Sequence, residues 1–232
     1  MRIPGLVGGR SLDRRRARLL RTAPPGPLRD YLSHPFPASS TRHLDLRLAA
    51  LDLETTGLDP RSDAILSIGL VPVDGLAITL AGARQVLVRG DREVGQSAAI
   101  HGLTDDAVAT GGSLVDALGL VLTALTGRVL LAHHAAIERS FLAAACMQVF
   151  GMPLVCPSVD TMVLEQRLVE AGSGHEAPPD SLRLQASRDR RGLPRYRSHD
   201  ALTDALACAE LYLAQVSALG HGQPVPLGRL MP

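Results

Sequence analysis

The sequence predicts an α/β domain with a mixed central sheet and helices on both faces. Two patterns predict this class: three apolar, strand-like runs with short turns between residues 46 and 88, and an alternation of strand and helix patterns from residue 113 to residue 219. Strands joined by short turns pair antiparallel, whereas strands separated by helices run parallel. At 232 residues, with 46% hydrophobic and 20% charged residues, the chain is long enough for one sizeable core.

The first three strand candidates form a predicted meander. Residues 46–54 are rich in apolar side chains and are followed by the turn residue Gly57. Residues 64–73 are almost continuously apolar, and the Asp-Gly turn after them leads into a third run at 77–88. The first of these strands therefore lies beside the second.

The second half of the chain alternates between helix and strand patterns. Apolar residues recur with a helical period before Gly127 and again after residue 135, and a capped helix closes the pattern. The predicted helices cover residues 97–109 in part, 113–125, 135–150, 161–169 and 200–219, and the predicted strands cover 129–132 and 154–159. Helices that connect parallel strands cover both faces of a sheet.

Charge divides the chain unevenly. All 24 basic residues are Arg, and residues 1–43 hold nine of them against two Asp, a local excess of +7, while the net charge of the whole chain is +1. We therefore predict a basic Arg/Pro-rich N-terminal extension at 1–43, a folded domain at 44–219 and a short C-terminal tail at 220–232. The extension either contacts nucleic acid, lies on the domain's own surface or is a solvated tail.

The cysteines and the hydropathy pattern indicate where the chain resides. The three cysteines are odd in number and contain no Cys-x-x-Cys pair, so they predict neither a disulfide framework nor a zinc site. No apolar run is long enough to span a bilayer, and the N-terminus lacks the features of a secretion signal. We expect a cytoplasmic protein with no membrane partner.

Two acidic residues share one face of the first predicted strand. In a strand, side chains two apart point the same way, so Asp52 and Glu54 lie on one face, and Leu51 and Leu53 lie on the other. Two carboxylates on a largely apolar strand are costly unless a cation compensates them. A divalent metal is the usual solution, and an exposed edge strand is the alternative.

Two later segments add further titratable groups. Glu138 lies about one turn into the helix that follows strand 129–132, near the strand end where open α/β sheets place their sites. Asp204 lies one turn inside the closing helix, which Asp200 or Ser198 would cap, and His199 stands just outside its start. Each residue alone is equally compatible with a surface position.

Together these segments resemble the DEDDh 3′→5′ exonucleases, the group that contains the proofreading epsilon subunit of bacterial DNA polymerase III, oligoribonuclease and ribonuclease T. The matching segments are residues 52–57, 133–142 and 199–205, and a fourth at 100–104 matches a stretch that borders the terminal nucleotide in the family. The resemblance covers residues 46–216. It implies an RNase H-like fold and phosphodiester hydrolysis with two Mg²⁺ or Mn²⁺ ions.

The resemblance also implies a role for each motif residue. Asp52, Glu54, Glu138 and Asp204 correspond to the metal ligands and His199 to the general base, because an unperturbed histidine titrates near neutrality. The second motif departs from the family pattern, since Glu138 and His134 stand where most members have Asp and Asn. The implied substrate contacts are Thr55, Thr56, His101, Leu103, Thr104 and His134.

These motifs predict a metal-dependent 3′→5′ exonuclease that acts on single-stranded 3′ ends, with DNA favoured over RNA and proofreading or repair as its setting. A DNA polymerase is a possible partner. The alternatives are an RNA-trimming or short-oligonucleotide exonuclease of the same family and a catalytically silent module that binds nucleic acid or a polymerase. The arginines of segment 183–197 form either a phosphate guide or a solvated surface loop.

Overall fold

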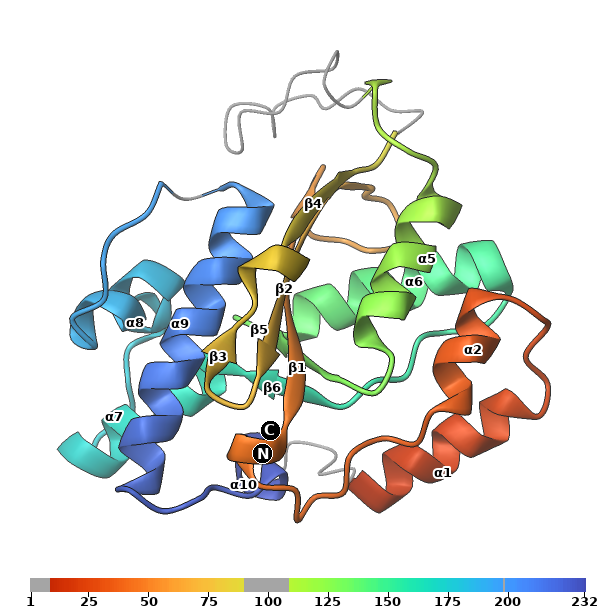
Figure 1. Cartoon of the computed structure of the whole chain (residues 1–232). Coiled ribbons are helices and arrows are strands. Elements are labelled where there is room, and N and C mark those ends of the chain that lie inside the picture. The colour runs from red at the N-terminus through yellow and green to blue at the C-terminus, as the bar shows by residue number, and fades with distance from the viewer. Residues whose placement is uncertain (1–8, 90–108, 198) are drawn as a thin grey trace.

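A mixed β-sheet runs through the centre of the structure, a computed structural model that describes residues 9–89, 109–197 and 199–232 (Figure 1). The strands of this described part are β1 (Arg47–Thr55), β2 (Ile65–Asp74), β3 (Ala77–Ile78), β4 (Arg84–Leu87), β5 (Val129–Ala132) and β6 (Ser158–Asp160). Their order is β3-β2-β1-β5-β6, and β4 pairs with β2. Strand β1 is antiparallel to β2 and parallel to β5, which confirms the predicted mixed sheet.

Helices cover both faces of this sheet. The helices are α1 (Gly9–Leu20), α2 (Pro27–Ser33), α5 (Leu114–Leu125), α6 (Ala136–Phe150), α7 (Thr161–Ser173), α8 (Leu184–Arg190), α9 (Ala201–Gly220) and α10 (Leu227–Leu230), with 3-10 turns η1 (His43–Asp45), η2 (Leu80–Gly82) and η4 (Pro179–Leu182). In Figure 1 α1, α2, α5 and α6 lie on one side of the sheet, and α7, α8 and α9 lie on the other. Among the described residues no helix is both long and apolar enough to cross a membrane.

The pleat of β1 divides the core into two apolar clusters. Leu51 belongs to the cluster with Leu118 of α5 and Phe141 of α6. Leu48 belongs to the cluster with Leu164 of α7 and others of α9 on the opposite face. Leu53 packs against the first cluster, so the even-numbered positions of β1 face α9, as the period of two predicts.

The described part of the N-terminal extension packs on the domain. Leu28, Tyr31 and Leu32 of α2 are buried in the same cluster as α5 and α6, and the Tyr31 hydroxyl donates to the Val155 carbonyl at 3.0 Å. The C-terminal tail is also held by backbone contacts, since the N–H of Leu227 donates to the Thr41 carbonyl at 2.8 Å. The end of the extension and the C-terminal tail therefore meet just before the start of β1.

The predicted strand over 77–88 is wrong, because the structure divides it into β3, η2 and β4. Pro72 in the neighbouring strand β2 has no N–H to donate, which interrupts pairing along that edge. The chain instead turns over Pro72, where the Thr79 N–H donates to the Pro72 carbonyl at 2.9 Å. Gly82 lies in this turn with no room for a Cβ, which would fall 2.7 Å from Pro72 Cγ.

Other predicted elements differ mainly in their bounds. Only the end of the predicted strand 154–159 joins the sheet, as β6. Its first partner pair in the sheet is Ser158 with Leu130 of β5. Helix α7 continues to Ser173, past the predicted end at 169, before Gly174 caps it in a left-handed conformation. The predicted helix over 97–109 lies almost entirely outside the described residues. The three cysteines are free and buried.

One close approach brings α9 onto the sheet. A Cβ on Gly69 of β2 would lie 1.9 Å from the Ala201 carbonyl oxygen and 2.5 Å from the Leu202 nitrogen, both at the first turn of α9. Gly69 is also the register partner of Asp52 on β1. The missing side chain at Gly69 therefore sets how closely the start of α9 approaches the middle of the sheet.

We expect Gly69→Ala to lower the free energy of unfolding by about 1–3 kcal/mol, because backbone atoms rather than a flexible side chain must move. Urea unfolding followed by circular dichroism measures this change. The matched control is Gly119→Ala within α5, where the nearest atom to the new Cβ is 3.8 Å away. That control should stabilise the protein by up to about 1 kcal/mol through helix propensity. Equal stability of the two variants would contradict the packing role of Gly69.

Candidate active site

The first part of the site comes from the last residues of β1. Asp52 and Glu54 lie on the face of the sheet that α9 covers, opposite Gly69 and Ser67 of β2 in the strand register. Asp52 is half-buried and Glu54 is 8% exposed. Two carboxylates are thus held at the carboxyl end of a central strand with little access to water.

Helix α9 brings a second pair of groups to the same place. Asp200 caps the helix by accepting from the Thr203 N–H at 2.9 Å. Asp204, one turn later, accepts from the backbone N–H of His199 at 2.8 Å. Ligand atoms of Glu54, His199 and Asp204 lie within 4.8 Å of one another. The predicted third motif therefore closes against the first.

Glu138 enters from the opposite side of the sheet, in the first turn of α6. It is 4% exposed, and its Oε2 atom has no hydrogen-bond partner among the described residues. Burial, followed by the charges of Glu138, Asp204 and Glu54, raises the pKa of Asp52, so these acids interact electrostatically. Of the five residues in the predicted catalytic set, Glu54, His199 and Asp204 have ligand atoms close together, and Asp52 and Glu138 interact with this group through charge.

Asp160 holds the turn that precedes Glu138. Its carboxylate accepts from the backbone N–H groups of His134 at 3.0 Å and Ala135 at 2.9 Å, and from the Met162 N–H at 2.9 Å at the start of α7. One buried carboxylate thus caps α7 and fixes the entry to α6. The sequence analysis missed Asp160, although an Asp that ends a strand and precedes a helix is a recognisable cap signal.

Left-handed backbone occurs at two of the site histidines. Among the described residues, positive φ values at non-glycine positions occur at His134 (71°), His199 (66°) and His221 (45°). His134 lies two residues before the start of α6, and His199 lies two residues before the start of α9, so each precedes a helix that carries a site carboxylate. Such conformations cost about 1–3 kcal/mol and persist only where surrounding contacts enforce them.

Burial and mutual repulsion perturb the acids of the site. Burial, followed by the charges of Glu138, Asp204, Glu54 and Asp200, raises the pKa of Asp52 well above its ordinary range. Burial raises the pKa of Glu138 to about 8. Burial and the nearby Asp204 raise the pKa of Glu54 to about 7, and burial also raises the pKa of Asp204. At neutral pH the site retains protons or requires a cation.

The donor set fits divalent cations of the hard type. Glu54 and Asp204 offer ligand atoms within 4.8 Å of each other and of His199, one buried oxygen of Glu138 has no partner, and no described Arg forms an ion pair with these acids or with Asp52. Carboxylate oxygens are the ligands that Mg²⁺ and Mn²⁺ prefer. A bound cation would supply the positive charge that the surrounding protein does not.

The two threonines of the first motif have local partners. The Thr55 hydroxyl donates to the Gly57 carbonyl at 2.6 Å, and the Thr56 hydroxyl donates to Asp63 at 3.2 Å. Their side chains therefore shape the loop after β1, where the exposed Leu58 follows. His134, a further predicted substrate contact, is exposed at the site. His101, Leu103 and Thr104 lie outside the described residues.

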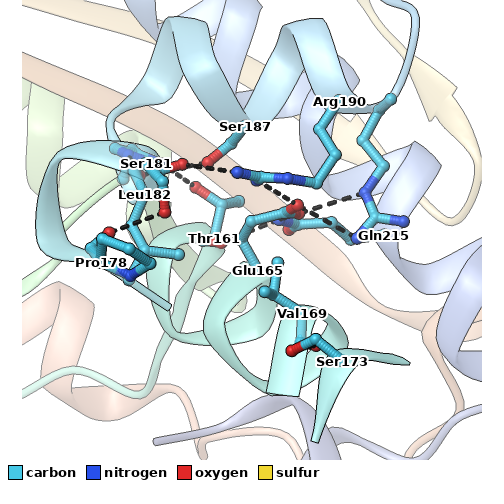
Figure 2. Close-up of polar contacts among 12 residues, drawn as sticks. Thr161, Glu165, Val169, Ser173, Pro178, Ser181, Leu182, Ser187, Arg190 and Gln215 are labelled. Atoms are coloured by element: carbon cyan, nitrogen blue, oxygen red, sulfur yellow. Dashed lines mark hydrogen bonds and ion pairs between the residues drawn. The ribbon is translucent and has the colours of Figure 1, made fainter. Parts of the chain in front are cut away.

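Most arginines of segment 183–197 are held by acidic partners. Arg190 and Arg191 pair with Glu165, a fully buried residue of α7 that also accepts from Gln215 at 2.9 Å (Figure 2). Arg188 is fully buried and binds Glu210 at 2.8 Å. The exposed pairs of this segment are Arg183 with Asp180 and Arg195 with Asp189. The segment is mainly a structural brace rather than a free phosphate guide or a solvated loop.

Comparison with known proteins places the chain among nucleases. A family model described as "Exonuclease" (RNase T) matches residues 49–212. DNA polymerase III PolC-type of Thermotoga maritima is 30% identical over 176 residues, 75% of this chain and 12% of that protein. DNA polymerase III subunit epsilon of Treponema pallidum is 28% identical over 176 residues, 75% of this chain and 79% of that protein. The chain thus spans about an eighth of the PolC-type relatives that it matches.

Solved structures share the fold. Exonuclease I of E. coli in complex with a dT13 oligonucleotide superposes with a TM-score of 0.64 at 16% identity, over 75% of this chain and 41% of that chain. Cell-death related nuclease 4 superposes with a TM-score of 0.63 at 14% identity, over 78% of this chain and 67% of that chain. The likeness confirms the predicted fold class.

We expect the free energy of unfolding, measured in chelator, to fall as pH rises from about 6.5 to about 8.5. Glu54 and Glu138 hold protons in the folded state up to pKa values of about 7 and about 8, well above their ordinary 4.5, so the folded state binds more protons in this interval. The interval begins at 6.5 because His133, whose pKa burial lowers to about 4, contributes the opposite slope below its ordinary 6.5.

Glu138→Gln should reduce this decline by up to about 1.4 kcal/mol per pH unit between pH 7 and pH 8, since one buried carboxylate no longer ionises. The matched control is Glu176→Gln, at an exposed loop position, which should keep the slope of the parent. Urea unfolding at pH 6.5, 7.5 and 8.5 measures the slopes. If Glu138→Gln keeps the slope of the parent, Glu138 does not carry the raised pKa.

Proposed function

The chain belongs to the exonuclease family whose model matches residues 49–212, and from this membership we propose that it is a metal-dependent enzyme that removes nucleotides from the 3′ ends of single-stranded DNA. The observation that carries the proposal is the close approach of Glu54, His199 and Asp204, with Asp52 and Glu138 near enough to interact with this group through charge. Membership makes the chain a hydrolase of phosphodiester bonds. Its polarity, its substrate and the roles of its residues are our proposal.

In this proposal Asp52, Glu54, Glu138 and Asp204 hold two Mg²⁺ or Mn²⁺ ions. Asp52, whose pKa is raised by burial and by the charges of several other acids, would be one of the ligands of these ions. When bound, such ions lower the pKa of a water molecule and neutralise charge that develops on the scissile phosphate. Glu138 is longer by one methylene than the Asp usual at this motif. It therefore supplies the same charge and places its carboxylate further from the helix backbone.

His199 is the proposed general base. It stands at the exposed mouth of the site, and its backbone N–H is anchored to Asp204, which keeps the imidazole near the carboxylates. The imidazole takes a proton from the attacking water, whose oxygen forms a bond to the terminal phosphorus. The bond from phosphorus to the 3′ oxygen of the preceding nucleotide breaks, and that oxygen gains a proton from solvent. The product is a nucleoside 5′-monophosphate.

DNA is proposed as the substrate because of what the relatives are named. The PolC-type and epsilon relatives are named as DNA polymerase III proteins, and the E. coli Exonuclease I structure holds a thymidine oligonucleotide. The same names support the removal of misinserted nucleotides beside a DNA polymerase as the setting. RNA trimming uses the same groups and differs only in the sugar. A silent binding module is disfavoured, because buried carboxylates with raised pKa values destabilise a fold that makes no use of them.

A time course on 5′-labelled single-stranded DNA and RNA of matched sequence tests this proposal. With Mg²⁺ or Mn²⁺, we expect the DNA to shorten progressively from its 3′ end, and with chelator we expect no shortening. Progressive shortening of the RNA alone would support the RNA-trimming alternative. Intact strands of both kinds in the presence of Mn²⁺ would overturn the proposed function.

Substitution separates the proposed roles. We expect His199→Gln to lower kcat about 10²–10⁴-fold, the usual contribution of a general base, and Asp52→Asn to lower it at least as much. The controls are His175→Gln and Asp30→Asn, conservative changes at exposed positions outside the site. Circular dichroism checks that each variant is folded. Full activity of folded His199→Gln would remove His199 from the mechanism.

A further inference from the structure

Helix α1 carries three arginines on its outer side. Arg14, Arg15 and Arg18 are exposed, and no described residue offers any of their side chains a hydrogen bond or an ion pair. This distinguishes them from the arginines of segment 183–197, of which most have acidic partners. The three charges are therefore available to a ligand.

A fourth arginine fixes this helix in position. Arg16 is 7% exposed and faces inward, where its guanidinium donates to Asp13 at 2.6 Å and to the Leu32 carbonyl of α2. Asp13 in turn accepts from the Phe36 N–H at 3.1 Å, and the Arg16 guanidinium lies 5.9 Å from the centre of the Phe36 ring. The inner contacts hold α1 as a rigid support, so its outer arginines have a defined position.

A groove of about 330 Å³ separates α1 from the beginning of α6. Leu12 and Arg15 line it from α1, and Ala136, Arg139 and Ser140 line it from the first turns of α6. Arg139 is exposed, and no acidic side chain lines the groove. Two guanidinium groups therefore face one cavity with no carboxylate to neutralise them.

Helix α6 lines this groove and also carries Glu138 of the active site. Arg139 follows Glu138 directly, and the two side chains leave the helix on different faces, Glu138 inward to the carboxylates and Arg139 outward to the groove. The diameter of a helix with its side chains is about 10–12 Å, which a strand of a few nucleotides crosses. A strand whose 3′ end occupies the site must pass around the start of α6 to reach the groove, as the inference below requires.

We infer that Arg14, Arg15, Arg18 and Arg139 form a second binding surface, which takes the phosphates of a single-stranded nucleic acid some nucleotides before its 3′ end. The inference rests on the proposed function. Arginine suits this ligand because its planar guanidinium binds phosphate oxygens in pairs. The surface holds the strand without reading its sequence, since it presents charge to the backbone and no aromatic side chain to the bases.

The test compares two triple variants of equal charge. Arg14→Gln, Arg15→Gln and Arg18→Gln remove the outer charges of α1, while Arg42→Gln, Arg47→Gln and Arg229→Gln remove three exposed charges beside the start of β1 and α10, at the bottom of Figure 1. The probe is a fluorescent thymidine oligonucleotide in chelator, so that no hydrolysis occurs. One strand has about 20 nucleotides, beyond the site size of about 4–16 for a single module, and one has about 4.

The α1 variant should raise Kd for the long strand about tenfold or more and lower the slope of log Kd against log salt by about 2, since each phosphate contact on a single strand contributes about 0.7. Binding of the short strand and the control variant should match the parent. Equal loss in both variants, or no loss in either, overturns the surface. Binding of a polyglutamate peptide is measured in parallel. If the α1 variant loses binding to this peptide and keeps the DNA binding of the parent, the surface serves an acidic protein partner and the inference is overturned.

Assays of hydrolysis with Mn²⁺, run beside this binding test, keep the two proposals apart. If the parent protein hydrolyses neither DNA nor RNA with Mn²⁺ while the α1 variant still loses affinity for the long strand, the proposed function fails and the surface stands. If the parent hydrolyses DNA and the α1 variant has the KM of the parent on the long strand, the function stands and the surface fails.

Discussion

Repulsion among carboxylates that are held away from water is the constraint on which the rest of this structure depends. Asp52 and Glu54 project from one strand, and Glu138 and Asp204 are brought against them from two helices on opposite faces of the sheet. Left to itself, such a group of acids would separate or stay protonated. The fold opposes this tendency with contacts made by the backbone, and a divalent cation is the group that relieves the remaining repulsion.

The supports of the site are small residues and caps rather than charged partners. Gly69 admits the first turn of α9 to the sheet, Asp200 caps that helix, and Asp160 fixes the turn before α6. The arginine side chains around α8 form ion pairs with other acids, Glu165 and Glu210, and not with the acids of the site. This separation leaves the acids of the site free for metal, and it leaves α1 as a source of positive charge for a polyanionic substrate.

Local patterns were sufficient for much of the fold. The period of two placed Asp52 and Glu54 on one face of β1, and helical periods with capping residues located α5, α6 and α9 to within a residue or so. The strand over 77–88 failed because its pairing depends on the missing N–H of Pro72 in another strand. The brace made by segment 183–197 was not predictable, because the partners of its buried arginines, Glu165 and Glu210, lie on other helices.

By itself the sequence determined the class of the fold, the residues that can bind metal or transfer a proton, and the family that the order of these residues indicates. Only the tertiary structure decided that the charge of Glu138 acts on Asp52, that His199 is tethered to Asp204 and that the arginines on the outer side of α1 are exposed. The physical reason is the distance along the chain over which each kind of interaction acts. Periodicity and capping act over a few residues of chain, whereas charge repulsion, burial and hydrogen bonding act through space between segments that the fold alone brings together.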